Sequence, residues 1–263
     1  MQRFYYDDQE EMHMADPEAL AFDMYGTLVD PIRIWTRLEQ YAPDEALRIA
    51  EVWRQKQLEY SFRLTVMERY EDFEQLTRKS LDYALAAAGR ELTVGQKDAL
   101  MAQYNDLERF SDVEPGLTRL QQFGHAMIVF SNGSPRMLDA LMDAAGLRQY
   151  FDGFVSVDEV RAFKPSPKTY RLAAERLGRP IGEVRLISSN PFDDIGAESA
   201  GMQATWVNRS GGLFDSLRPP PQMIVESLTE LAEVLDKDDQ GLRPTTTRSS
   251  DPAGGVVDPE ESR

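Results

Sequence analysis

The sequence predicts an α/β protein with a Rossmann-like parallel sheet and a helical-bundle cap inserted after the first strand. Two observations support this prediction. Short apolar segments alternate with helical ones over residues 111–236, which is typical of parallel strands joined by crossover helices. Residues 31–110, which precede this region, are charged, poor in glycine and helical in periodicity. We therefore expect an α/β core of residues 17–30 and 111–236 that carries a cap of residues 31–110.

The first predicted strand ends in an acid. The apolar run Leu20–Phe22 is followed by Asp23, and Gly26 then allows a tight or left-handed turn. Ligands of open α/β sheets bind just beyond the carboxyl ends of the strands. Asp23 is therefore the residue around which we expect the site to be built.

Apolar residues at helical spacing predict several helices in the cap. They are EALRIAEVWRQKQLEYSFRL at residues 45–64, VMERYEDFEQLTRKSLDYALAAAG at residues 66–89, and a further helix from about Thr93 to Asp106. Gly89 suits the C-cap of the second of these helices. The plainest interpretation of this region is a helical bundle with a small core of its own.

The rest of the core is predicted from strands and helices that alternate after Pro115–Gly116. Ser134–Pro135 and Ser166–Pro167 each combine a helix-capping serine with a proline that suits the first helical position. The predicted strands are His125–Phe130, Gly153–Val157, Val184–Ser188 and Gln203–Val207. The predicted helices are Leu117–Phe123, Ser134–Ala145, Ser166–Leu177, one from about Asp194, and Leu228–Leu235.

Composition excludes several kinds of site. The 263 residues carry a formal charge of −16 and include no cysteine and two histidines, His13 and His125. Thiol chemistry and disulfides are excluded, and Ser-His catalysis and multi-histidine metal sites are disfavoured. The negative charge argues against nucleic-acid and anionic-membrane partners. No apolar run approaches the ~20 residues that cross a bilayer, so we expect a cytoplasmic protein. Residues 1–16 and 237–263 are polar and are expected to be disordered.

Polar residues follow the ends of several predicted strands. They are Asp23 with Thr27, Ser131 with Asn132, Lys164 in a KPSP turn, and the run Ser188–Asp194. Taken singly, such residues are more often ordinary turn or surface residues. Because the carboxyl ends of parallel strands lie on one edge of a sheet, we expect these residues to share one site.

In this order, the motifs DxYGT, SNG, K-P and SxNxxD resemble those of the haloacid dehalogenase superfamily, and specifically of the L-2-haloacid dehalogenases. The resemblance covers about residues 18–235. Its most specific local match is WRQKQLEY at residues 53–60, which is similar to a cap helix of that family. The arginine of that helix faces the active site in the family, and it corresponds here to Arg54. Without the match, Arg54 would be read as a solvated helix charge.

Two positions depart from the metal-dependent phosphatases of the same superfamily. Those enzymes carry DxDxT in the first motif and an acid at the start of the fourth. This chain has Tyr25 and Ser189 at these positions. The loss of two carboxylates leaves a poor ligand set for Mg²⁺. Displacement of a halide from carbon needs no metal, so we expect no metal and no cofactor.

The resemblance implies hydrolysis of short (S)-2-haloalkanoic acids to (R)-2-hydroxy acids through an ester on Asp23, with haloacetates and fluoroacetate within its range. Lys164 would keep Asp23 ionised, and Asp193 would hold the lysine. The implied catalytic residues are Asp23, Thr27, Lys164, Ser188, Asn190 and Asp193. The implied substrate contacts are Ser131, Asn132, Arg54, Tyr25, Leu58, Phe73, Tyr170 and Phe192, of which Arg54, Asn132 and Phe192 would receive the halide. Asp194 has no counterpart in this pattern, and a first-turn helix acid is its simpler interpretation.

Two alternatives stay open from the residues alone. One is a Mg²⁺-dependent phosphatase for a small phosphoester, and the other is a catalytically silent binding or regulatory protein of the same fold. The expected partners of the enzyme are a haloacid and a halide ion. Members of the family are often homodimers, so the resemblance also allows a homodimer.

Overall fold

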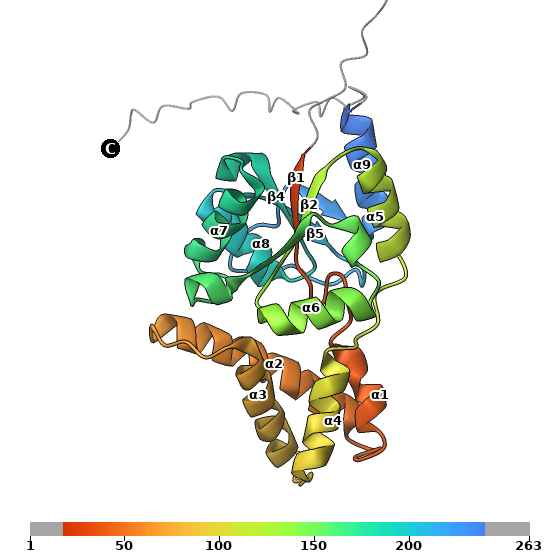
Figure 1. Ribbon diagram of the computed structural model, residues 1–263, viewed down its shortest axis with the longest axis vertical. Coiled ribbons are helices and arrows are strands. Elements are labelled where there is room, and N and C mark those ends of the chain that lie inside the picture. Colours follow the sequence, from red (N-terminus) through yellow and green to blue (C-terminus); the bar gives the residue numbers. More distant parts are fainter. Residues whose placement is uncertain (1–17, 240–263) are drawn as a thin grey trace, which may run out of the picture.

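The computed structural model describes residues 18–239, and the prediction for residues 1–16 lies outside them. Six strands form one parallel sheet with the order β3-β2-β1-β4-β5-β6 (Figure 1). The strands are β1 (Ala19–Phe22), β2 (Ala126–Ser131), β3 (Gly153–Ser156), β4 (Val184–Ser188), β5 (Gln203–Val207) and β6 (Met223–Val225). The predicted fold class, a parallel α/β sheet surrounded by helices, is confirmed.

Strand β1 lies in the middle of the sheet and is fully buried. Its last residue, Phe22, is in register with Val129 of β2 on one side and Ile187 of β4 on the other. The chain adds β3 beyond β2 and then crosses back over β1 to form β4. This reversal creates a switch point beside β1, which is where open α/β sheets bind their ligands. Asp23 follows β1 directly and so lies at that point.

Helices cover both faces of the sheet (Figure 1). On one face α7 (Pro167–Leu177) packs beside α8 (Pro191–Ala200), and α8 also contacts β4 and β5. On the other face α5 (Val113–Gln122) packs against α9 (Leu228–Asp239), while α6 (Pro135–Ala144) contacts β3. Helices therefore shield both faces of the sheet from solvent, so that polar side chains can gather only at its carboxyl edge.

The cap, defined here as residues 32–104, lies beneath the carboxyl edge of the sheet in Figure 1. The cap helices are η1 (Ile32–Ile34), α1 (Trp35–Leu38), α2 (Ala46–Val66), α3 (Phe73–Ala87) and α4 (Val94–Tyr104). Helices α2 and α3 pack closely, and the buried indole of Trp53 in α2 donates a hydrogen bond to the carbonyl of Thr77 in α3 at 2.8 Å.

The predicted helix at residues 66–89 is wrong over its first part. Helix α2 ends at Val66, and α3 begins only at Phe73. The Asp72 carboxylate accepts a hydrogen bond from the backbone N–H of Gln75 at 2.8 Å and caps the new helix. Such a cap favours a helix start, whereas the spacing of the apolar residues continues across the break and does not reveal it.

Two helix starts in the core are also earlier than predicted. Helix α5 begins at Val113, so Pro115–Gly116 lies within its first turn. Helix α8 begins at Pro191 and not near Asp194. Both differences have one cause: the first N–H groups of a helix have no partner within it, so proline is tolerated in the first turn.

Two features at the end of the chain were not predicted. The short edge strand β6 pairs with β5 through Thr205 and Met223. Helix α9 runs to Asp239 and so extends beyond its predicted end at Leu235. The remainder of the tail predicted to be disordered lies outside the described residues.

Candidate active site

A tight turn holds Asp23 at the end of β1. The Asp23 N–H donates to the carbonyl of Ile187 at 3.0 Å, which extends the pairing of β1 with β4. Gly26 has φ +93°, a conformation that side chains disfavour. A Cβ at Gly26 would lie 3.4 Å from Nδ2 of Asn190, which is an ordinary van der Waals contact. Glycine is therefore favoured at this position by the backbone conformation of the turn.

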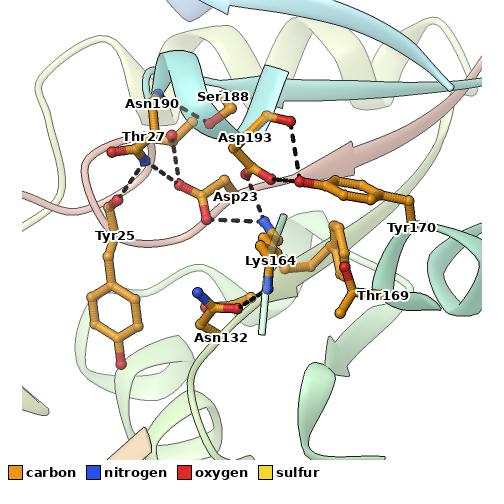
Figure 2. Close-up of polar contacts among 12 residues, drawn as sticks. Asp23, Tyr25, Thr27, Asn132, Lys164, Thr169, Tyr170, Ser188, Asn190 and Asp193 are labelled. Carbon is orange, nitrogen blue, oxygen red and sulfur yellow. Dashed lines mark hydrogen bonds and ion pairs between the residues drawn. The ribbon is translucent and has the colours of Figure 1, made fainter. Parts of the chain in front are cut away.

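The carboxylate of Asp23 is 6% exposed and hydrogen bonded at both oxygens (Figure 2). Lys164 Nζ lies 3.1 Å from Oδ1. Oδ2 accepts from Thr27 Oγ1 at 3.0 Å and from Asn190 Nδ2 at 2.8 Å. Because Oδ1 has one donor and Oδ2 has two, Oδ1 is the less restrained oxygen.

Lys164 is almost completely buried, with 1% of its surface exposed. Its ammonium group donates to Asp23 Oδ1, to Asp193 Oδ2 at 2.8 Å and to the carbonyl of Phe130 at 2.8 Å. Burial opposes the charge, but Asp193 and Asp23 raise the pKa of Lys164 above its usual value. The lysine therefore stays protonated between two carboxylates.

Asp193 is held from the first turn of α8 toward Lys164 (Figure 2). Its second oxygen, Oδ1, accepts a hydrogen bond from the Tyr170 hydroxyl at 2.7 Å. Burial raises the pKa of Asp193, and Lys164 opposes that shift. A Cβ at Gly196 would lie 2.3 Å from the Tyr170 oxygen, so only glycine allows α8 to approach Tyr170 this closely.

The end of β2 supplies Ser131 and Asn132, both buried. Asn132 Oδ1 accepts from the backbone N–H of Lys164 at 2.9 Å, so the Asn132 Nδ2 group is left as a donor. Ser131 Oγ accepts from the N–H of Gly133 at 3.1 Å and keeps its own hydroxyl hydrogen to donate. Ser188, at the end of β4, accepts from the N–H of Asn190 at 3.1 Å and shapes that turn.

The cap brings Arg54 and Phe73 to the turn that follows Asp23. Arg54 Nη2 donates to the carbonyl of Tyr25 at 3.2 Å, and the guanidinium carbon lies 5.9 Å from the Tyr25 ring centroid. The Tyr25 ring packs against Phe73, with 5.7 Å between ring centroids. Burial raises the pKa of Tyr25 well above its usual value, so its hydroxyl stays neutral. A cation and an aromatic wall thus face the turn.

Two predicted residues lie apart from this network of hydrogen bonds and ring contacts within residues 18–239. Leu58 is half-buried on α2, and Phe192 packs edge-on against Phe62 of the cap with ring centroids 5.1 Å apart. Within residues 18–239, no hydrogen bond or ring contact joins either residue to Asp23. Their placement in the substrate pocket stays a prediction.

Known proteins are similar to this chain over most of its length. A family model for haloacid dehalogenase-like hydrolases matches residues 17–201. The chain is 36% identical over 83% of its length to an (S)-2-haloacid dehalogenase of Pseudomonas sp. strain YL, of which it covers 94%. It is 34% identical over 83% of its length to haloacetate dehalogenase H-2 of Moraxella sp. strain B, of which it covers 97%. The chain belongs to the (S)-2-haloacid dehalogenase family of haloacid dehalogenase-like hydrolases.

A solved structure of this family has the same fold. It is the L-2-haloacid dehalogenase of Xanthobacter autotrophicus with chloropropionic acid covalently bound. This chain is 33% identical to it and superposes with a TM-score of 0.79, covering 84% of this chain and 99% of that one. No helix in residues 18–239 is long and apolar enough to cross a membrane.

The two positions that differ from the phosphatase branch do not suit a cation. The hydroxyl of Tyr25 is buried and has no hydrogen-bond partner within residues 18–239, and Ser189 Oγ accepts from Arg209 Nη1 at 3.0 Å. A guanidinium thus contacts the serine that stands at the position of the phosphatase acid. No group of three acidic or histidine side chains within residues 18–239 is arranged to hold a metal ion.

Some residues around the dehalogenase-family site are not apparent from the sequence. Arg209 follows β5 and forms an ion pair with Asp112 at 2.9 Å. It also donates a hydrogen bond to Ser189 Oγ, and the backbone N–H of Ser189 donates to Thr27 Oγ1. Gln57 is buried beside Arg54 in the cap. No local pattern marks Arg209, and Gln57 lies within the WRQKQLEY segment without a role of its own being apparent, because each residue becomes relevant only when distant segments meet.

Asp194 lies in the first turn of α8, as expected, but it is fully buried. Neither of its carboxylate oxygens has a hydrogen-bond partner among the described residues. Burial and the negative charges of Asp193 and Asp23 raise the pKa of Asp194 well above its usual value. Two adjacent carboxyl groups therefore differ: Asp193 is paired with Lys164 and Tyr170, whereas burial without a partner disfavours the charged form of Asp194.

Proposed function

We propose that the protein hydrolyses short (S)-2-haloalkanoic acids, haloacetates included, to the corresponding 2-hydroxy acids through an ester on Asp23. The observation that carries this proposal is a buried carboxylate paired with the Lys164 ammonium group at 3.1 Å, with Tyr25 and Ser189 where phosphatases have acids. The names of its relatives and the covalently bound chloropropionic acid in one of them support it.

In the first step Asp23 Oδ1 attacks the carbon that bears the halogen, from the side opposite the halogen. An oxygen–carbon bond forms while the carbon–halogen bond breaks, and the bonding pair leaves with the halide. The carbon is inverted, and an ester links it to Asp23. Hydrogen bonds from Thr27 and Asn190 fix Oδ2, so that Oδ1 faces the substrate.

In the second step water attacks the carboxyl carbon of Asp23. The bond from that carbon to the ester oxygen breaks, one water proton completes the hydroxyl of the (R)-2-hydroxy acid, and the other proton is released. Asp23 is restored as a carboxylate. Lys164 faces the ester oxygen throughout and stabilises negative charge that develops there.

The substrate carboxylate binds the Ser131 hydroxyl and the N–H groups of the turn at residues 131–133. Arg54 and Asn132 Nδ2 receive the halide, with Phe192 as a wall. The apolar part of the acid contacts Tyr25, Leu58 and Phe73. These assignments follow the family resemblance, and the contacts of Arg54 with the Tyr25 carbonyl and of Asn132 with the Lys164 N–H support them.

The test is hydrolysis in ¹⁸O-water with excess enzyme. In a single turnover the label enters Asp23 and not the product, because water attacks the carboxyl carbon. The product carries ¹⁸O only after a second cycle on the same enzyme, and direct labelling of the first product would overturn the ester route. The Asp23→Asn variant, folded but unable to attack, is expected to release no halide.

The same assay separates the alternative functions. Chloro-, bromo- and fluoroacetate and both enantiomers of 2-chloropropionate are compared with and without EDTA. A haloacid dehalogenase of this design releases halide from the (S)-enantiomer at the same rate in EDTA. A phosphatase would release phosphate from phosphoesters and lose that activity in EDTA, and a silent binding protein would do neither.

A further inference from the structure

A buried glutamine lies behind Arg54. Gln57 is one turn further along α2, and its side chain is fully buried. Its Oε1 accepts from Arg54 Nη1 at 2.7 Å and from the Tyr104 hydroxyl at 3.0 Å. Its Nε2 donates to Thr77 Oγ1 at 2.7 Å. One amide therefore joins α2, α3 and α4 at the point where the cap presents Arg54.

Thr77 determines which way the Gln57 amide points. The Thr77 hydroxyl donates its one hydrogen to the carbonyl of Phe73 at 2.6 Å, so its oxygen can only accept from Gln57. A flipped amide would place oxygen against oxygen at Thr77 and an NH₂ group against the guanidinium of Arg54, which has donors only. The observed orientation is the one that satisfies all of these buried groups.

The consequence is that Arg54 is fixed at both terminal nitrogens. Gln57 holds Nη1, and the carbonyl of Tyr25 holds Nη2 at 3.2 Å. The same carbonyl accepts from Asn190 Nδ2 at 3.0 Å, and that Nδ2 also donates to Asp23. The guanidinium is therefore placed relative to the nucleophile and not only relative to its own helix.

We propose that Gln57, oriented by Thr77, is a positioning residue that holds Arg54 toward the leaving halide. The inference rests on the proposed role of Arg54 as a halide-binding residue. A neutral acceptor suits this position, because a glutamate would pair with the guanidinium and weaken its attraction for halide. An apolar side chain would leave Arg54 Nη1 and the Tyr104 hydroxyl without their acceptor.

The first readout compares leaving groups in Gln57→Met and Gln57→Glu. We expect kcat for (S)-2-chloropropionate to fall by about 10- to 100-fold, because misplaced catalytic groups cost rates of this order. The loss should be smaller for (S)-2-bromopropionate, since bromide departs with less assistance. Gln55→Glu, at an exposed position of the same helix, is the matched control and should leave both rates unchanged. Equal losses for both substrates in the Gln57 variants would overturn the proposal.

The second readout does not depend on turnover. Phenylglyoxal modifies accessible guanidinium groups, and peptide mass spectrometry measures the rate at Arg54. We expect faster labelling of Arg54 in Gln57→Met and Thr77→Val, and an unchanged rate in Thr77→Ser, which keeps the hydroxyl. An unchanged rate in the first two variants overturns the positioning role. A wild-type protein that releases no halide overturns the proposed function alone, so the two failures are distinguishable.

Discussion

The core half and the cap half of the site are built differently. In the core half, Lys164 and Asp193 are buried among strand and helix ends, and every hydrogen of the lysine ammonium has an acceptor. In the cap half, Arg54 is half-buried and reaches the core through one hydrogen bond to the Tyr25 carbonyl. The groups that act on Asp23 are thus fixed by the sheet, whereas the groups assigned to the halide are carried by a separate layer of helices.

This difference predicts two kinds of defect. A change in the core half alters the hydrogen bonds and the ion pair that hold the nucleophile, and it should lower turnover with every substrate. A change in the cap half alters how the substrate and halide are enclosed, and it should act selectively on KM or on one leaving group. The following substitutions are ordered by the size of the effect expected.

The largest effect is expected from Lys164→Met. It removes the cation between Asp23 and Asp193 and leaves two buried carboxylates facing one another. Loss of a preorganised charge of this kind lowers kcat by about 10²- to 10³-fold, and breaking a buried pair costs about 3–5 kcal/mol of the free energy of unfolding. Halide release and urea denaturation measure the two effects. Lys168→Met, one turn away and exposed, should change neither, and near-normal turnover in Lys164→Met would show that Asp23 does not need the cation.

Tyr170→Phe should give a smaller defect of the same kind. It removes the hydroxyl that donates to Asp193 Oδ1 at 2.7 Å, so Asp193 holds the lysine less firmly. One such bond is worth about 1 kcal/mol, which corresponds to roughly a fivefold lower kcat if it acts fully on the transition state. The decrease should be equal for chloride and bromide substrates. A decrease confined to one leaving group would place Tyr170 with the cap half instead.

Tyr70→Phe tests the contact between the cap and the core away from Arg54. The Tyr70 hydroxyl donates to Asp158 at 2.7 Å, and its ring stacks on Phe163, the residue before Lys164, with centroids 5.1 Å apart. The variant keeps the stack and loses the hydrogen bond, so KM should rise by up to about fivefold while kcat changes little. Burial and Asp158 raise the pKa of Tyr70, so the effect should be constant from pH 6 to pH 9. An unchanged KM would mean that this contact does not hold the cap.

The sequence is sufficient to predict which residues of the core half meet. Asp23 and Asn132 each follow a parallel strand and Ser188 ends one, and parallel strands place their carboxyl ends on one edge. The helix starts at Pro135 and Pro167 were also predictable from the first-turn prolines, although only Ser134 caps its helix with its side chain. Pro191 is likewise the first residue of α8, but the polar residues around it resemble a loop, so the start of this helix was predicted too late.

The cap half is less accessible from the sequence. Gln57 is an ordinary polar residue of a charged helix, and its burial depends on how α2, α3 and α4 pack. Asp72 caps the start of α3, although the helical spacing of the apolar residues continues across the break after Val66. These features depend on contacts between helices, for which local periodicity carries no signal.

Asp194→Asn should have the smallest effect on turnover. In contrast to Lys164→Met, it should increase the free energy of unfolding. Asp193 and Asp194 are adjacent and buried, but only Asp193 has partners. The raised pKa of Asp194 means that the folded protein keeps a proton that the unfolded chain releases above about pH 4. The stability that this proton contributes is fully present below the unfolded pKa and is lost as the pH rises toward the folded pKa. Asparagine removes this loss, so the variant should be more stable than wild type at neutral pH.

The pH dependence of the free energy of unfolding tests this prediction. Between about pH 4 and the folded pKa, the wild-type free energy of unfolding should fall relative to that of Asp194→Asn by up to about 1.4 kcal/mol per pH unit. Asp143→Asn is a control of opposite sign, because a hydrogen bond from Arg148 lowers the pKa of Asp143 and makes its charge stabilising above the unfolded pKa. Parallel stability curves for wild type and Asp194→Asn would mean that Asp194 ionises normally and has a partner. If the stability curves of wild type and Asp194→Asn diverge with pH while kcat stays constant, Asp193 pairs with Lys164, whereas Asp194 only lowers the stability of the folded protein.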